Sequence, residues 1–195
     1  MNLHASSPGR RLARILAAVM AAVMAVVVAL ASGWAAPAAL QADELRVAVA
    51  SNFRQAMAAT AQRFEEVSGH AVVLIPGSTG KHYAQIRNGA PYDAFFAADA
   101  DKLRRLEQER RIVPGSRFTY AIGRLVLWSA DPALVDSEGE VLQSDRFRHL
   151  AIANPELAPY GAAARAVLQA LGLWEGLTPK LVRGENIEQT FQFII

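Results

Sequence analysis

Short runs of alternating apolar and polar residues predict strands, and the stretches between them carry apolar residues at helical spacing. The first run, 44–50 (ELRVAVA), predicts a strand. Positions 53–67 then predict a helix, with Asn52 as its N-cap and Gly69 at its end. The same reasoning predicts the other elements of this half, which are strands at 71–75 and 93–97, a helix at 81–87, and a helix capped by Asp99 or Asp101 that runs to Leu106. This alternation with short connections indicates an α/β fold with mostly parallel sheets flanked by helices.

The pattern changes after Gly115. Two β-like runs, 118–122 and 125–128, follow each other without a helix between them, which suggests that the chain crosses there into a second lobe. The elements predicted beyond this point are a strand at 150–153, a helix at 161–171, a turn at 174–177, a short strand at 180–182 and a last helix capped by Asn186. We therefore expect lobe I to span 43–121 and lobe II to span 122–195.

The first forty-two residues differ in character from the rest. Three arginines, Arg10, Arg11 and Arg14, precede an apolar stretch at 15–30, and small residues then end in the A-x-A-like sequence at 40–42. This order is typical of a secretory signal peptide, and we expect residues 1–42 to be cleaved. An uncleaved membrane anchor is the alternative, because the uncharged stretch is long enough to span a bilayer.

Removal of this leader changes the charge balance. The whole chain has 20 Lys and Arg residues, 18 Asp and Glu residues and a net charge of +2, and the leader holds three of the basic residues and no acidic one. The mature part therefore has a net charge of −1, which gives no indication of a nucleic acid partner. The absence of cysteine suits an oxidising compartment.

Small polar residues stand where predicted strands end and helices begin. They are Ser51-Asn52, Gly77-Ser78-Thr79-Gly80, Pro159-Tyr160-Gly161 and Asn186-Ile187. Ligands of open parallel sheets bind beyond the carboxyl ends of the strands, where helix N-termini present free N–H groups that suit an anion. Helix capping explains each residue singly. Their recurrence at successive strand ends favours a common anion site.

Other chemistries have less support. The GSTGK run fails the phosphate-loop pattern, because Ile75 and His82 stand where Gly and Ser or Thr are required. Asp93 and Asp99 are expected to form turns and caps rather than a catalytic pair. Without a Ser–His or Cys–His pair there is no nucleophile, so we do not expect an enzyme. The spacing of His70, His82 and His149 does not fit a metal site. We expect these histidines at the surface or in loops.

Longer strings of the sequence resemble one family. These strings are VAVASNFRQAM, GSTGKHYAQI, GAPYDAFFAAD and NPELAPYG, and the similarity extends over 44–193. Together they resemble the periplasmic molybdate-binding proteins of ABC importers. The resemblance implies a type II-like, two-lobed periplasmic-binding-protein fold that holds a dehydrated oxyanion between its lobes, with no cofactor and no counter-cation. Because members of this family continue further, we expect the chain to be truncated at its C-terminus and its second lobe to be incomplete.

The same resemblance implies the ligand contacts and the partners. Hydroxyls, amides and one backbone N–H group would bind molybdate or tungstate, and the residues are Ser51, Asn52, Ser78, Thr79, Tyr160 and Ile187. The expected protein is a periplasmic monomer that delivers its ligand to the membrane permease of an ABC transporter. The alternatives are a binding protein for another oxyanion such as sulfate or phosphate, a periplasmic hydrolase, and a membrane-tethered sensor lobe.

Overall fold

The computed structural model describes residues 43–195 of the 195-residue chain. The predicted signal peptide, residues 1–42, lies outside the described residues. Across 43–195, every helix is too short or too polar to cross a membrane.

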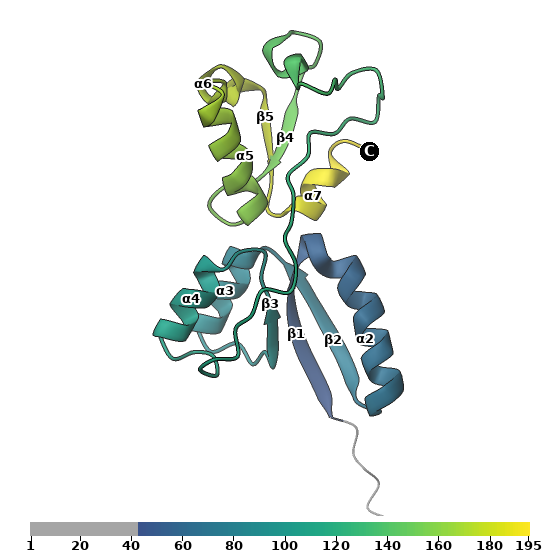
Figure 1. Cartoon of the computed structure of the whole chain (residues 1–195), viewed down its shortest axis with the longest axis vertical. Helices are drawn as coiled ribbons and strands as arrows, with labels where there is room; N and C mark the ends of the chain where they lie inside the picture. The colour runs from purple at the N-terminus through teal and green to yellow at the C-terminus, as the bar shows by residue number, and fades with distance from the viewer. Residues whose placement is uncertain (1–42) are drawn as a thin grey trace, which may run out of the picture. The chain divides into compact units, whose positions relative to one another are not determined.

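A parallel sheet with the strand order β2-β1-β3 forms the first lobe together with helices α2, α3 and α4. Helix α2 lies on one side of the sheet, and α3 and α4 lie on the other (Figure 1). Because both faces of the central strand are covered, its residues 47–50 are all buried. The elements are β1 (Glu44–Ala50), η1 (Ser51–Phe53), α2 (Arg54–Ser68), β2 (Ala71–Gly77), α3 (Thr79–Arg87), β3 (Ala94–Phe96) and α4 (Asp101–Gln108).

The sequence predicts these elements well, but the start of α2 differs. Gly69 ends the helix as expected, in a left-handed conformation with a φ of 73°. Asn52 is not the N-cap, because a 3₁₀ turn over Ser51–Phe53 precedes the helix, and no side chain caps it. The Asn52 amide is therefore free for another role.

The second lobe is built on a parallel pair of strands, β4 and β5, and helices α5 and α7 flank this pair (Figure 1). The start of α5 lies very close to the end of β4. A Cβ on Gly161 would overlap the carbonyl group of Ala153, so only glycine allows this approach. The elements are β4 (Leu150–Ala153), α5 (Pro159–Ala170), α6 (Trp174–Leu177), η3 (Thr178–Lys180), β5 (Leu181–Gly184) and α7 (Ile187–Gln192).

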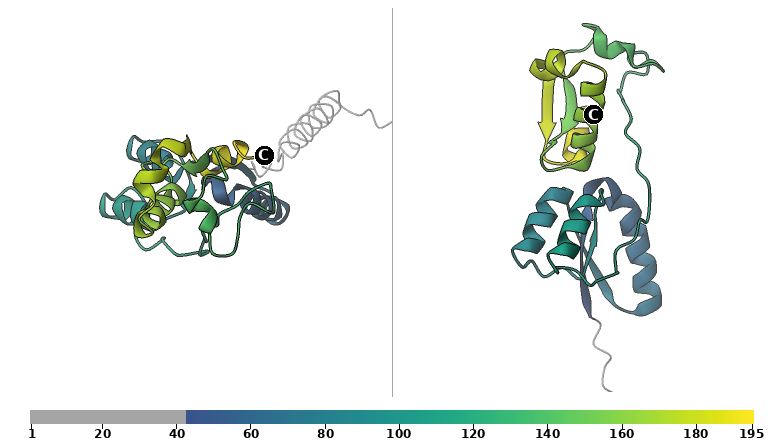
Figure 2. Two further views of the ribbon diagram at one scale, coloured as in Figure 1. Left: turned by 90° about the horizontal axis from the view of Figure 1, so that it is seen from above. Right: turned by 60° about the vertical axis from the view of Figure 1, so that its left-hand side comes forward.

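The two strands predicted at 118–122 and 125–128 are wrong for the described structure. Between α4 and β4 the chain forms only one regular element, the short 3₁₀ helix η2 (Glu140–Gln143), and the segment before it runs as an extended coil (Figure 2). A strand needs a neighbour to bond with, and these runs have none within 43–195. Side chains anchor the segment instead: the Tyr120 hydroxyl donates to the Ala97 carbonyl at 2.9 Å, and Trp128 packs on Phe191.

Candidate functional site

The first wall of the site is the turn between β2 and α3. Ser78 is extended (φ −77°, ψ 146°) and caps α3, because its Oγ accepts a hydrogen bond from the Lys81 N–H at 3.3 Å. Thr79 Oγ1 accepts from the Ala98 N–H at 2.9 Å, which ties the turn to the segment after β3. The two residues are 2% and 0% exposed. Neighbouring backbone groups therefore fix the positions of both hydroxyl oxygens.

This bonding determines what the two hydroxyls can offer a ligand. Each hydroxyl oxygen already accepts one backbone N–H, and each hydroxyl proton remains free to donate. A fixed pair of O–H donors suits a ligand that presents only acceptors, as an oxyanion does.

The turn after β1 forms the second wall. Ser51 is half-buried, and the neighbouring Asn52 is exposed. Both lie in the 3₁₀ turn η1, directly after the fully buried end of β1. The parallel register Ala50↔Gly77 brings this turn beside Ser78, because both strands end at the same edge of the sheet.

The second lobe supplies the remaining walls. Pro159 opens α5, and Tyr160 follows it in the first turn of that helix. Ile187 opens α7, whose N-cap Asn186 accepts from the Gln189 N–H at 3.0 Å. The side-chain oxygen Oδ1 of Asn186 is used in this cap, and the side-chain NH₂ group keeps both of its donor protons.

One small cavity brings these walls together. It is lined by all six residues that the sequence predicted, Ser51, Asn52, Ser78, Thr79, Tyr160 and Ile187. The cavity is small, with about 10 Å³ of space for the centre of a water molecule. This size suits a ligand of a few heavy atoms rather than a sugar or a peptide. Its other lining residues, which sequence reasoning did not assign as ligand contacts, are Ala50, Gly77, Ala98, Ala158, Pro159 and Asn186.

The cavity has a distinct electrostatic character. None of its lining residues carries a charged side chain, so hydrogen-bond donors and the N-terminal ends of helices α3 and α5 determine its polarity. Burial raises the pKa of Tyr120, and the nearby Tyr160 acts in the same direction. Tyr120 therefore stays neutral, but its hydroxyl proton is already donated to the Ala97 carbonyl, and Tyr120 does not line the cavity.

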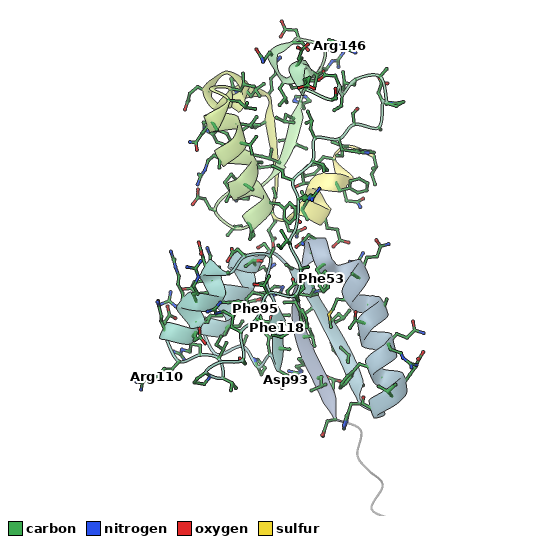
Figure 3. All side chains as sticks on the ribbon, in the orientation of Figure 1. Phe53, Asp93, Phe95, Arg110, Phe118 and Arg146 are labelled. Atoms are coloured by element: carbon green, nitrogen blue, oxygen red, sulfur yellow. The ribbon has the colours of Figure 1, made fainter. Side chains whose placement is uncertain are left out.

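The described residues hold no metal centre, and the larger hollows are lined by residues other than those of the small cavity. Across 43–195, no group of three or more His, Asp or Glu residues is arranged to hold a metal ion. A larger hollow of about 560 Å³ lies beside β3, where Phe95 and Phe118 (Figure 3) are among its mostly apolar lining residues. It lacks the converging hydroxyls of the small cavity.

His82 corrects one expectation from the sequence, because it is buried and not at the surface. Its ring fills the space beside Gly77, where a Cβ would lie 2.8 Å from the ring Nε2. Nδ1 lies 3.1 Å from the Gln85 Oε1, which also accepts from the Tyr92 hydroxyl, so Nδ1 donates to this oxygen in the tautomer that has its proton there. Nε2 is buried without a partner. Burial lowers the pKa of His82, and the neighbouring Lys81 charge contributes in the same direction.

Asp93 and Asp99 are structural, as the sequence predicts. The Asp93 Oδ2 accepts from the Arg46 N–H at 2.7 Å at the start of β3, and the Asp99 Oδ1 accepts from the Lys102 N–H at 2.9 Å in the first turn of α4. Neither lines the small cavity.

Comparison with known proteins gives a consistent set of relatives. The profile of the family described as bacterial extracellular solute-binding protein matches residues 45–195. The molybdate-binding protein ModA of Azotobacter vinelandii is 53% identical over 156 residues, which cover 80% of this chain and 62% of the relative. ModA of Rhodobacter capsulatus is 49% identical over 164 residues, which cover 84% of this chain and 64% of the relative. The chain therefore spans less than two thirds of the length of these relatives.

A solved structure is similar over the same region. The periplasmic molybdate-binding protein of Azotobacter vinelandii superposes with a TM-score of 0.75 at 47% sequence identity, over 77% of this chain and 66% of that one. The fold described above is therefore shared with that protein.

Proposed function

Because the chain belongs to the bacterial extracellular solute-binding protein family, we propose that it captures a tetrahedral oxyanion, molybdate or tungstate, in the small cavity between its lobes. The observation that carries this proposal is the bonding of Ser78 and Thr79. Both buried hydroxyls accept backbone N–H groups and keep their protons for a ligand that only accepts. The names of the relatives, which are molybdate-binding proteins, support the choice of ligand.

The proposed ligand contacts are the six residues already named. Ser51, Ser78 and Thr79 donate from hydroxyls, Asn52 from its amide and Tyr160 from its phenol, and Ile187 donates its backbone N–H. About six charge-assisted hydrogen bonds, each contributing about 1.5–3 kcal/mol, exceed the cost of association and predict a Kd that is micromolar or lower.

The same arrangement gives a basis for selectivity. Hydrogenphosphate carries a proton that needs an acceptor, and the cavity lining has no carboxylate to accept it. Sulfate is fully deprotonated but smaller than molybdate, so it leaves some of the fixed donors without a partner. We therefore expect the protein to favour molybdate and tungstate over both.

The wider role follows from the family. We propose that the protein acts as a monomer in the periplasm, after cleavage of residues 1–42, and that it delivers its ligand to the membrane permease of an ABC transporter. We also propose that lobe I ends near residue 121 and lobe II begins at 122, because Tyr120 is bonded to Ala97 in the first lobe and Trp128 packs on Phe191 in the second.

Isothermal titration calorimetry with molybdate, tungstate, sulfate and phosphate tests the proposal. We expect saturable binding of the first two with a Kd that is micromolar or lower, and at least a hundredfold weaker binding of the other two. Tighter binding of sulfate or phosphate would assign the cavity to that anion instead. Absence of binding for all four anions would overturn the proposal.

A further inference from the structure

A direct backbone contact joins the two lobes beside the cavity. The Gly80 N–H in the first turn of α3 donates to the Leu157 carbonyl, in the loop before α5, at 2.8 Å. The first N–H groups of a helix have no partner within that helix, and here the other lobe supplies one. Gly80 therefore uses its free N–H for contact between the lobes rather than for the ligand.

The contact requires a residue without a side chain. A Cβ at position 80 would lie 2.7 Å from the Leu157 carbonyl oxygen and 3.1 Å from its Cα. Gly80 does not have a positive φ, so backbone conformation does not explain the glycine. Because the colliding atoms are backbone, they have no rotamer through which to move away.

Two ion pairs reinforce the contact. The Lys81 Nζ lies 3.1 Å from the Glu185 Oε1, beside the Gly80 contact. The Arg54 guanidinium, at the start of α2, lies 2.6 Å from the Glu188 Oε1 of α7. All four side chains are partly exposed, so each pair is a modest contributor.

The position of this contact relates it to the ligand. Gly80 directly follows Ser78 and Thr79, and Leu157 comes three residues before Tyr160. We propose that Gly80 is a positioning residue, whose lack of a side chain lets Leu157 approach α3 and sets the distance between the donors of the two lobes. Lys81 and Glu185 assist it. The effect on ligand affinity rests on the proposed function, whereas the contact between the lobes does not.

Distance measurements and calorimetry test the two parts separately. The chain has no cysteine, so nitroxide labels at Ala59→Cys in α2 and Ala166→Cys in α5, both exposed, report the separation of the lobes. Gly80→Ala is compared with Gly176→Ala, a helical glycine in α6 where an added Cβ meets nothing within 4 Å. Each is measured without ligand and with molybdate.

We expect Gly80→Ala to lengthen the distance between the labels and to weaken molybdate binding at least about tenfold, which corresponds to one lost hydrogen bond. Gly176→Ala should keep the original distance and affinity. An unchanged distance in Gly80→Ala would overturn the proposal. If the unsubstituted protein does not bind molybdate, the proposed function fails, and the distances in the ligand-free protein still decide whether Gly80 positions the lobes.

A charge-swap series keeps the proposal testable if Gly80→Ala does not fold. Lys81→Glu alone and Glu185→Lys alone each place like charges together, and we expect each to weaken molybdate binding about two- to fivefold. The double variant restores the pair with reversed polarity and should recover the original affinity. If the double variant loses as much affinity for molybdate as the two single variants together, this pair has no role in joining the lobes.

Discussion

The two sides of the cavity are built differently. On the first lobe, Ser78 and Thr79 are fully buried, and both hydroxyls serve the fold by accepting backbone N–H groups. On the second lobe, Tyr160 and Ile187 are half-buried, and contacts between the lobes hold them near the first-lobe residues. Ligand binding and folding should therefore be coupled on the first lobe and separable on the second.

Thr79→Val should produce the largest effect, because it removes a group that serves both roles. The Ala98 N–H loses its acceptor, which should lower the free energy of unfolding by about 1–3 kcal/mol. Loss of the hydroxyl donor should weaken molybdate binding about 10- to 150-fold. Urea denaturation and calorimetry measure the two quantities. Thr79→Ser retains the hydroxyl and should stay close to the original protein in both, whereas unchanged stability in Thr79→Val would show that this hydroxyl does not support the fold.

Tyr160→Phe should separate the two properties on the other side of the cavity. Loss of one hydroxyl donor should weaken molybdate binding about tenfold, while the free energy of unfolding should stay within about 0.5 kcal/mol of the original value. Tyr83→Phe is the matched control, because its hydroxyl bonds the exposed Glu109 and lies outside the cavity lining. An equal loss of affinity in both variants would argue against a ligand contact at Tyr160.

The sequence predicted that these residues lie together, as the cavity lining shows, because the strand ends carry a local signal. Parallel strands end at one edge, so the polar residues after β1 and β2 had to meet. The same reasoning singled out Tyr160 and Ile187, and the family resemblance implied their role as ligand contacts. That resemblance to solute-binding proteins is confirmed by the family match over 45–195. The bonds that fix the donors were not predictable in the same way. Thr79 bonds Ala98, and Gly80 bonds Leu157, and both pairs depend on how distant segments pack.

The difference between local sequence signals and the packing of distant segments also explains the incorrect predictions for the fold. Alternation at 118–128 correctly indicates an extended backbone but contains no information about a partner strand, so the two strands predicted there are not formed within the described residues. His82 was expected at the surface or in a loop, yet it occupies the space that Gly77 leaves open beside Tyr92 and Phe95. Local composition does not show that such a space exists.

His82 provides a test of how the stability of the first lobe depends on pH. Its pKa in the folded protein is lowered by burial, so below about pH 6.5 the unfolded chain binds the additional proton more readily. Stability should therefore be complete above pH 6.5 and decline as the pH falls, by at most about 1.4 kcal/mol per pH unit. Urea denaturation from pH 5 to 8 measures this slope. His82→Gln should flatten it, and His149→Gln, which removes an exposed histidine, should leave it in place. The same slope in both variants would assign the pH dependence to other groups. It would also mean that the unpaired Nε2 of His82 accepts a proton without loss of stability. The turn that carries Ser78 and Thr79 would then be less sensitive to a buried charge than its packing implies.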